Sequence, residues 1–170
     1  IWPSGLEVTI EEHRATAFWD GGDGDDRLVN EYGEVFDANL AEVEDDSLPM
    51  LGGPDGSSPQ VLAAHQRLMP VLLPLNAQIE SLRITRRGSW QAELDNGVVM
   101  ELGRGNAAGD FHDVSERPAR FVRTHAEVVG RFGNPKVQHV DLRHGNGYAL
   151  QLEGVEPSAP GKPQQPPKKR

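Results

Sequence analysis

Histidines and acidic residues are the side chains of this sequence that could carry out chemistry. Six histidines stand at positions 13, 65, 112, 125, 139 and 144, and no two of them have the spacing of an HExxH zinc site. His112 lies next to Asp113 and close to Asp110, a grouping that suits a loop metal site or an acid–base pair. A metal-dependent hydrolase therefore stays open as one hypothesis, although a structural role is favoured for each histidine.

An acidic, glycine-rich segment at residues 20–26 has the composition of a calcium-binding loop, because carboxylate oxygens are the ligands that Ca²⁺ prefers. With Asp20 as the first ligand of an EF-hand, however, Gly22 would occupy the third position. A solvated hairpin loop is the favoured interpretation. The glycine-rich segments 52–57 and 103–106 lack the spacing of a P-loop or a GxGxxG motif, so their patterns predict no phosphate site.

Composition and charge exclude several classes of protein. The 170 residues carry a net charge of −9, and residues 1–55 hold 15 acidic and two basic side chains. This balance argues against a nucleic-acid-binding surface. Cysteine is absent, which excludes disulfides and thiol chemistry, and no cofactor is predicted. No apolar run approaches the roughly 18 residues of a membrane span. Since the chain begins Ile1-Trp2-Pro3, we expect a fragment whose signal or anchor lies upstream.

The periodicity of apolar residues predicts a strand-rich chain with two helices. The first predicted elements are a strand at 6–10, an extended stretch at 15–19 and a hairpin with strands at 28–29 and 35–36. A helix follows, capped by Ser57 or Ser58 and with Pro59 in its first turn. After it come a meander of strands over 79–103, a helix at about 115–131, and final strands over 137–142 and 148–152. Residues 37–57 are acidic and turn-rich and are expected to form an irregular surface connection, with Leu48, Met50 and Leu51 as apolar anchors.

The order of these elements predicts an α+β fold built on an antiparallel sheet with two inserted helices, since no βαβ alternation is evident. The strand at 148–152 precedes a proline-rich, basic tail at 156–170 that is expected to be disordered. Such a last strand is expected at a sheet edge, where unpaired N–H and C=O groups can accept a strand from another chain. A peptide-binding module is therefore a second hypothesis beside the hydrolase.

Several short motifs follow one another along the chain. They are Trp2-Pro3 with Leu6-x-Val8-x-Ile10-x-Glu12, Ala17-x-Trp19, Leu28-Val29 with Gly33 and Phe36, Leu48-Pro49-x-Leu51, Gly53-Pro54-x-Gly56-Ser57, Arg87-Gly88-x-Trp90, Leu94-Asp95-Asn96-Gly97, Leu102-Gly103-Arg104 and Val140-Asp141-Leu142-Arg143. With these motifs the sequence resembles the periplasmic part of the FtsQ family of bacterial cell-division proteins. Each motif alone is weak, but their shared order across residues 2–150 is specific.

The resemblance implies a domain organisation and a cellular role. Residues 1–19 would hold the last strand of a POTRA domain and its connection, residues 20–155 the FtsQ-type β-domain, and residues 156–170 the tail. The family implies a scaffold of the divisome that is not an enzyme and that binds FtsB and FtsL, with other divisome proteins as further candidates. It also implies a single-pass anchor in the inner membrane, with this region in the periplasm at the septum.

The resemblance further implies a set of partner-binding residues at the end of the chain. In the family the last strands receive an FtsB segment by strand addition, and FtsB contributes acidic side chains. The matching positions here are Arg143, His144, Asn146, Gly147 and Leu152, with Arg87 as a nearby cation. Arg143 and Arg87 would then act as charge partners. Two departures are His144, where the family usually has Tyr, and Ala15, where it usually has Pro. A different periplasmic peptide-binding module remains the alternative.

Overall fold

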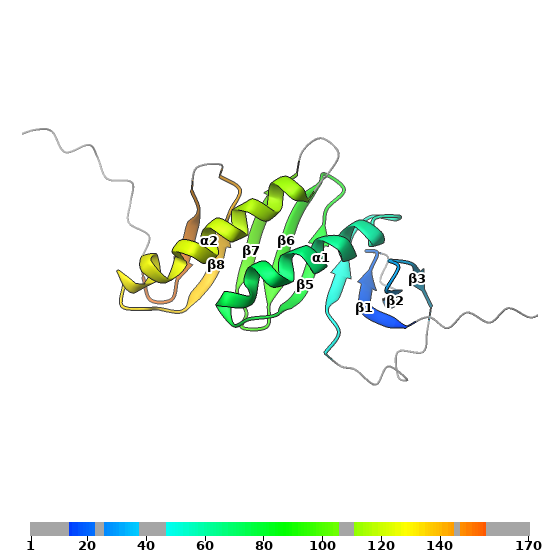
Figure 1. Ribbon diagram of the computed structural model, residues 1–170, viewed down its shortest axis with the longest axis horizontal. Coiled ribbons are helices and arrows are strands. Elements are labelled where there is room, and N and C mark those ends of the chain that lie inside the picture. Colours follow the sequence, from blue (N-terminus) through cyan, green and yellow to red (C-terminus); the bar gives the residue numbers. More distant parts are fainter. Residues whose placement is uncertain (1–13, 23–25, 38–46, 106–110, 145–146, 156–170) are drawn as a thin grey trace, which may run out of the picture.

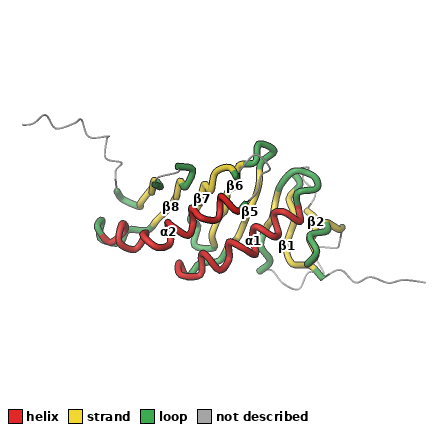
Figure 2. Tube along the Cα trace, turned by 45° about the horizontal axis from the view of Figure 1, so that its top comes forward, coloured by secondary structure: helices red, strands yellow, loops and turns green. Residues whose placement is uncertain are grey.

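A computed structural model describes residues 14–22, 26–37, 47–105, 111–144 and 147–155. These residues form a nine-stranded sheet, and two helices lie side by side along one of its faces (Figures 1 and 2). The predicted strand at 6–10 and the tail at 156–170 lie outside the described residues. No helix in the described part of the chain is long and apolar enough to cross a membrane.

The elements follow one another in an order rich in strands. The strands are β1 (Ala15–Asp20), β2 (Asp26–Asn30), β3 (Val35–Phe36), β4 (Met50–Gly52), β5 (Ile79–Ile84), β6 (Ser89–Leu94), β7 (Val99–Arg104), β8 (Val137–Asp141) and β9 (Ala149–Leu152). The helices are α1 (Ser58–Leu72), the short 3-10 helix η2 (Leu73–Leu75) and α2 (His112–Gly130). The α+β class with two helices, the first hairpin, the meander and the last strand are therefore confirmed.

The sheet is mixed rather than wholly antiparallel. Its strand order is β3-β2-β1-β4-β5-β6-β7-β8-β9, with parallel pairs at β1–β4, β4–β5 and β7–β8. The other five pairs are antiparallel. Two of the parallel pairs are joined through a helix, as β4-α1-β5 and β7-α2-β8. The expectation that βαβ units are missing is therefore wrong, since a helical crossover joins each of these two parallel pairs.

Strand β4 corrects the expectation of an irregular connection over residues 37–57. Its three residues pair with β1 on one side and β5 on the other, and Leu51 is fully buried. A strand of three residues is too short to show an alternating apolar pattern, which explains why the sequence did not reveal it. Residues 38–46 of that connection lie outside the described residues.

Helix α1 begins at the predicted position, but it lacks the predicted side-chain cap. Neither Ser57 nor Ser58 caps the helix with its side chain. Instead, the Ser57 hydroxyl donates to the Pro54 carbonyl at 2.6 Å, and the Ser58 hydroxyl donates to the Gly33 carbonyl at 2.7 Å. The second bond ties the start of α1 to the β2–β3 turn, 25 residues away. The two serines therefore fix the position of the helix rather than its first N–H groups.

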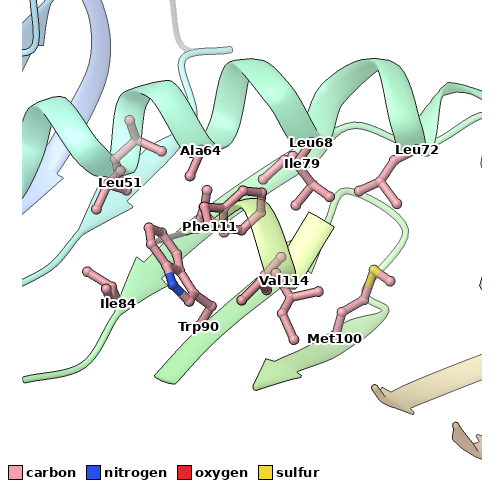
Figure 3. Packing of buried hydrophobic residues seen from close by; sticks show 14 of the residues in the cluster. Leu51, Ala64, Leu68, Leu72, Ile79, Ile84, Trp90, Met100, Phe111 and Val114 are labelled. Atoms are coloured by element: carbon pink, nitrogen blue, oxygen red, sulfur yellow. The ribbon is translucent and has the colours of Figure 1, made fainter. Parts of the chain in front are cut away.

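One hydrophobic core lies between the sheet and the two helices (Figure 3). Trp90 of β6 is fully buried, and its ring meets the edge of Phe111 at a centroid distance of 4.9 Å. Leu68 and Leu72 of α1 and Met100 of β7 are also fully buried. This core fixes α1 and α2 against the sheet. It thereby fixes the position from which the chain continues from α2 into β8 and β9.

Candidate partner-binding edge

Strand β9 ends the sheet, as the sequence predicts for its last strand. It pairs with β8 in antiparallel register, with Asp141 opposite Ala149 and His139 opposite Gln151. In the described part of the chain no other strand pairs with it. An edge strand leaves the backbone groups of its outer side without a ladder partner. The free side of β9 is therefore the place where another strand can be added.

Two hydrogen bonds reveal which backbone groups of β9 face outward. The Glu153 N–H donates to the Lys136 carbonyl at 2.9 Å, so residue 153 directs its N–H toward the β8 side. The Leu142 N–H donates to the Glu101 carbonyl at 2.8 Å, so residue 141 directs its own N–H toward β9. Because successive residues of a strand alternate, Ala149 and Gln151 bond to β8. Leu150 and Leu152 consequently direct their N–H groups to the free edge.

Tyr148 fixes the start of β9 to helix α2. Its hydroxyl lies 2.7 Å from the hydroxyl of Thr124, and its ring meets the Phe121 ring edge to face at 5.3 Å. Leu150 and Tyr148 also pack against the core from the strand side. The edge is thus held in place by its side chains while its outer backbone stays open. The sequence predicts no role for Tyr148 or Thr124, because neither residue belongs to a recognisable motif.

Arg143 lies directly after β8 and is bound to Asp141 by a bidentate ion pair. Its Nε donates to Oδ1 at 2.9 Å, its Nη2 donates to Oδ2 at 2.6 Å, and its backbone N–H donates to Oδ1 at 3.0 Å. The Asp141 side chain is only 14% exposed, whereas that of Arg143 is 60% exposed. The carboxylate therefore orients the guanidinium, while much of the guanidinium remains open to solvent.

This ion pair changes the acid–base properties of both groups. The hydrogen bond from Arg143 is the main cause that lowers the pKa of Asp141 from 3.8 to about 2, although partial burial opposes it. The same bond raises the pKa of Arg143. Both groups are therefore charged throughout the physiological range, and Asp141 offsets part of the attraction that Arg143 exerts on an acidic partner.

Arg87 reaches the same end of the sheet from a different turn. It is exposed in the turn between β5 and β6, and Ser89, at the start of β6, pairs with Arg104 at the end of β7. Since β7 and β8 are parallel, Arg104 and Arg143 end neighbouring strands on the same side. Two and a half strand spacings separate the turn from the end of β8, or about 12 Å. Arg87 and Arg143 thus lie at the same end of the sheet, in two different connections.

The remaining predicted partner-binding residues have different environments. His144 is exposed, and its carbonyl accepts a 3.5 Å hydrogen bond from Nη2 of Arg120 on α2. Gly147 precedes β9 and is half-buried, whereas Leu152 is 7% exposed and contributes to the core side. Asn146 lies outside the described residues. The structure therefore brings Arg143, His144 and Gly147 to the edge and directs the Leu152 side chain inward.

A bulge in β7 connects this end of the sheet to helix α2. Trp90 pairs with Gly103 while Gln91 pairs with Glu101, so Leu102 is an extra residue in β7. The freed Leu102 carbonyl accepts a 2.7 Å hydrogen bond from Nη1 of Arg117 on α2. Gly103 has a φ of +84°, and a Cβ there would lie 2.5 Å from that Arg117 nitrogen. The Leu102-Gly103 motif is visible in the sequence, but no sequence pattern connects it to Arg117 on α2.

The described residues do not test the hydrolase hypothesis. Within those ranges no three His, Asp or Glu side chains form a cluster that could hold a metal ion. Asp110 lies outside the described residues, and so do the side chains of His112 and Asp113 at the start of α2. The centre of the acidic segment 20–26 lies outside as well.

The chain is similar to cell-division proteins over most of its length. The family described as Cell division protein FtsQ/DivIB, C-terminal, matches residues 17–143. Cell division protein FtsQ of Nitrosospira multiformis is 36% identical over 149 residues, which cover 88% of this chain and 56% of that protein. The protein of the same name from Burkholderia pseudomallei is 34% identical over 155 residues, covering 91% and 58%. Cell division protein FtsQ of Coxiella burnetii is 34% identical over 151 residues, which cover 89% of this chain and 57% of that protein.

The chain spans somewhat more than half the length of the curated relatives it matches. The family match begins within β1 and ends at Arg143, so it includes β2 to β8 and both helices. The edge strand β9 and Tyr148 lie beyond the residues that the family matches. The chain belongs to the FtsQ/DivIB family of cell division proteins.

Proposed function

We propose that this chain is the partner-binding domain of a non-enzymatic scaffold of the bacterial divisome, and that it binds FtsB together with FtsL. Membership of the FtsQ/DivIB family supports the role in cell division. The observation that carries the binding proposal is the open edge of β9. A segment of FtsB would add to the sheet there as a tenth strand.

Strand addition uses the backbone first and the side chains second. The N–H groups of Leu150 and Leu152 face the free edge and would donate to carbonyls of the incoming strand. The side chains of the same two residues pack inward. The edge strand would therefore keep its place in the core while it receives a partner. Tyr148, fixed to α2 through Thr124, would hold the strand in the geometry that binding requires.

The arginines at this end would select and orient an acidic partner. Arg87 forms no ion pair within the described ranges, and Arg143 exposes much of its guanidinium. Two cations on backbone positions about 12 Å apart can contact two carboxylates of one partner segment. In a chain with a net charge of −9, this local positive charge gives an acidic segment a defined place to approach.

The same proposal extends to location and domain organisation. The parent protein would be a single-pass protein of the inner membrane, with this region in the periplasm at the septum. Residues 1–19 would include the last strand of a POTRA domain, residues 20–155 would form the β-domain, and residues 156–170 would be a tail. Membership of the FtsQ/DivIB family supports this arrangement.

Titration calorimetry with the periplasmic parts of FtsB and FtsL tests the proposal. The Arg143→Ala chain should bind at least tenfold more weakly, because it loses a charged contact at the edge. Arg131→Ala is the matched control, since Arg131 is 69% exposed and paired with Glu127 at the far end of α2. That variant should bind like the wild type. Equal affinity of all three chains, or no binding by the wild type, would contradict the proposal.

A further inference from the structure

A hollow of about 330 Å³ lies at the carboxyl ends of β1, β4 and β5, several strands away from the β9 edge. It is lined by Asp20–Gly22 after β1, Gly52–Pro54 after β4, and Arg83–Arg86 at the end of β5. Three strands, β6, β7 and β8, separate its nearest strand from β9. Its volume lies within the range of small-molecule sites in proteins.

The path of the chain explains why a hollow forms at this place. Strands β1, β4 and β5 are parallel to one another, so their carboxyl ends meet at the same end of the sheet (Figure 1). From β1 the chain turns to β2 on one side, whereas from β4 it passes through α1 to β5 on the other side. Connections that leave neighbouring parallel strands in opposite directions open a crevice between them. In open sheets, ligands commonly bind in such a crevice.

The side chains of the hollow suit an anion. Among the described residues that line it, the charged ones are Asp20, Arg83 and Arg86, whose charges sum to +1. Asp20 is already engaged, because its Oδ2 accepts from Nη2 of Arg83 at 3.2 Å and its Oδ1 accepts from the Gly22 N–H at 2.8 Å. Arg83 is thereby oriented along the wall of the hollow. Arg86 has no ion pair or hydrogen bond within the described ranges, so its guanidinium can bind a ligand.

The backbone of the hollow also favours a small polar ligand. Four of its ten lining residues are glycines, at positions 21, 22, 52 and 53. Gly22 has a φ of +81°, a conformation that favours glycine, and a Cβ there would meet no described atom within 4 Å, so the surface beside it is open. Gly53 differs, because a Cβ there would lie 2.4 Å from the Ser57 hydroxyl. The open wall beside Gly22 allows an oxyanion to approach the main chain closely.

We propose that this hollow is a second binding site of the domain, in which Arg83 and Arg86 hold an oxyanion, either a phosphate or a carboxylate group of a small ligand. Arg86 would form the direct contact, and Asp20 would keep Arg83 in the orientation that the anion needs. A planar guanidinium can give two parallel hydrogen bonds to such a group. The site uses none of the backbone groups of the β9 edge, and its direct contact, Arg86, precedes Arg87 in the β5–β6 turn.

NMR titration of the 170-residue chain with inorganic phosphate at constant ionic strength tests the site. We expect saturable shifts of the amide signals of Gly21, Gly22 and Gly52. In the Arg86→Gln chain the apparent Kd should rise about tenfold, since one charge-assisted contact is lost. Arg104→Gln is the matched control, because Arg104 is an exposed arginine at the same sheet end but outside the hollow. This control should leave the Kd unchanged.

A parallel titration with acetate distinguishes the two kinds of oxyanion. Saturation by phosphate alone assigns the site to phosphate groups, and saturation by acetate alone or by both assigns it to carboxylates or to oxyanions in general. Each of these results supports the proposal. Shifts that never saturate, or that fall equally in the Arg86→Gln and Arg104→Gln chains, would show diffuse screening and overturn it. Because FtsB and FtsL are absent from this experiment, its outcome is independent of the partner-binding proposal.

Discussion

Replacing Asp141 by Asn should separate two effects of the ion pair at the end of β8. The substitution keeps the shape of the side chain but removes the negative charge that binds Arg143. In the wild type the carboxylate accepts hydrogen bonds of 2.9 and 2.6 Å from the guanidinium and one of 3.0 Å from the backbone. We expect Asp141→Asn to lower stability and, at the same time, to strengthen binding of an acidic partner.

The size of the stability loss follows from the exposure of the pair. The fully formed contact lowers the pKa of Asp141 from 3.8 to about 2, so the ionised form favours the folded state. Solvent screens a guanidinium that is 60% exposed, and exposed ion pairs contribute 0.2–1 kcal/mol, with bidentate pairs at the upper end. We therefore expect a loss of about 1 kcal/mol at pH 7 in urea unfolding.

The pH dependence has a defined sign. Because the folded-state pKa is lower than the unfolded-state value of 3.8, the stabilisation is fully present above about pH 5. It is lost as the pH falls from there toward 2, where the folded-state carboxylate also binds a proton. The difference in unfolding free energy between wild type and Asp141→Asn should therefore shrink between pH 5 and pH 2.

Partner binding should change in the opposite direction. Without the carboxylate of Asp141, more of the Arg143 guanidinium is available to an acidic partner, and affinity for FtsB with FtsL should rise several-fold in calorimetry. Glu127→Gln is the matched control, because it breaks the exposed ion pair with Arg131 and should change both quantities little. Unchanged stability of Asp141→Asn, or binding as weak as that of Arg143→Ala, would refute this reasoning.

Three further substitutions test the packing that positions the edge and the site. Gly33→Ala should cost about 2 kcal/mol or more in urea unfolding, because Gly33 has a φ of +84° and a Cβ would lie 2.6 Å from Cα of Pro59. Leu51→Ala should cost 2–5 kcal/mol in the same assay, since Leu51 is fully buried in β4; a loss below 1 kcal/mol would argue against β4 as a core strand. Tyr148→Phe should cost about 1 kcal/mol through the lost 2.7 Å bond to Thr124, and NMR should show faster amide exchange in β9; unchanged exchange would contradict the anchoring role.

Elements with long periodic patterns could be predicted from the sequence. The meander over 79–103 and both helices lie close to their predicted positions, because each presents a full apolar face to one core. The edge position of the last strand was also predicted correctly. In contrast, β4 and the parallel pairing depend on contacts between segments that are distant in sequence, and three residues of β4 carry too little pattern to show them.

The candidate sites were less predictable than the fold, because they depend on geometry across elements. The hydrogen bond between Tyr148 and Thr124 joins residues 24 positions apart, and no spacing rule connects them. The hollow at β1, β4 and β5 was missed for a related reason. The glycine-rich segment 52–57 has no phosphate motif, and only the parallel strands bring it next to Arg83 and Arg86.

Amide hydrogen exchange at β9, measured by NMR with and without FtsB and FtsL, tests strand addition most directly. The N–H of Gln151 is bonded to β8, so it should exchange slowly in both states and serve as an internal reference. The N–H of Leu150 faces the free edge, and we expect partner binding to slow its exchange at least tenfold. If the complex forms while Leu150 exchanges as fast as in the free chain, the partner binds elsewhere and strand addition is contradicted.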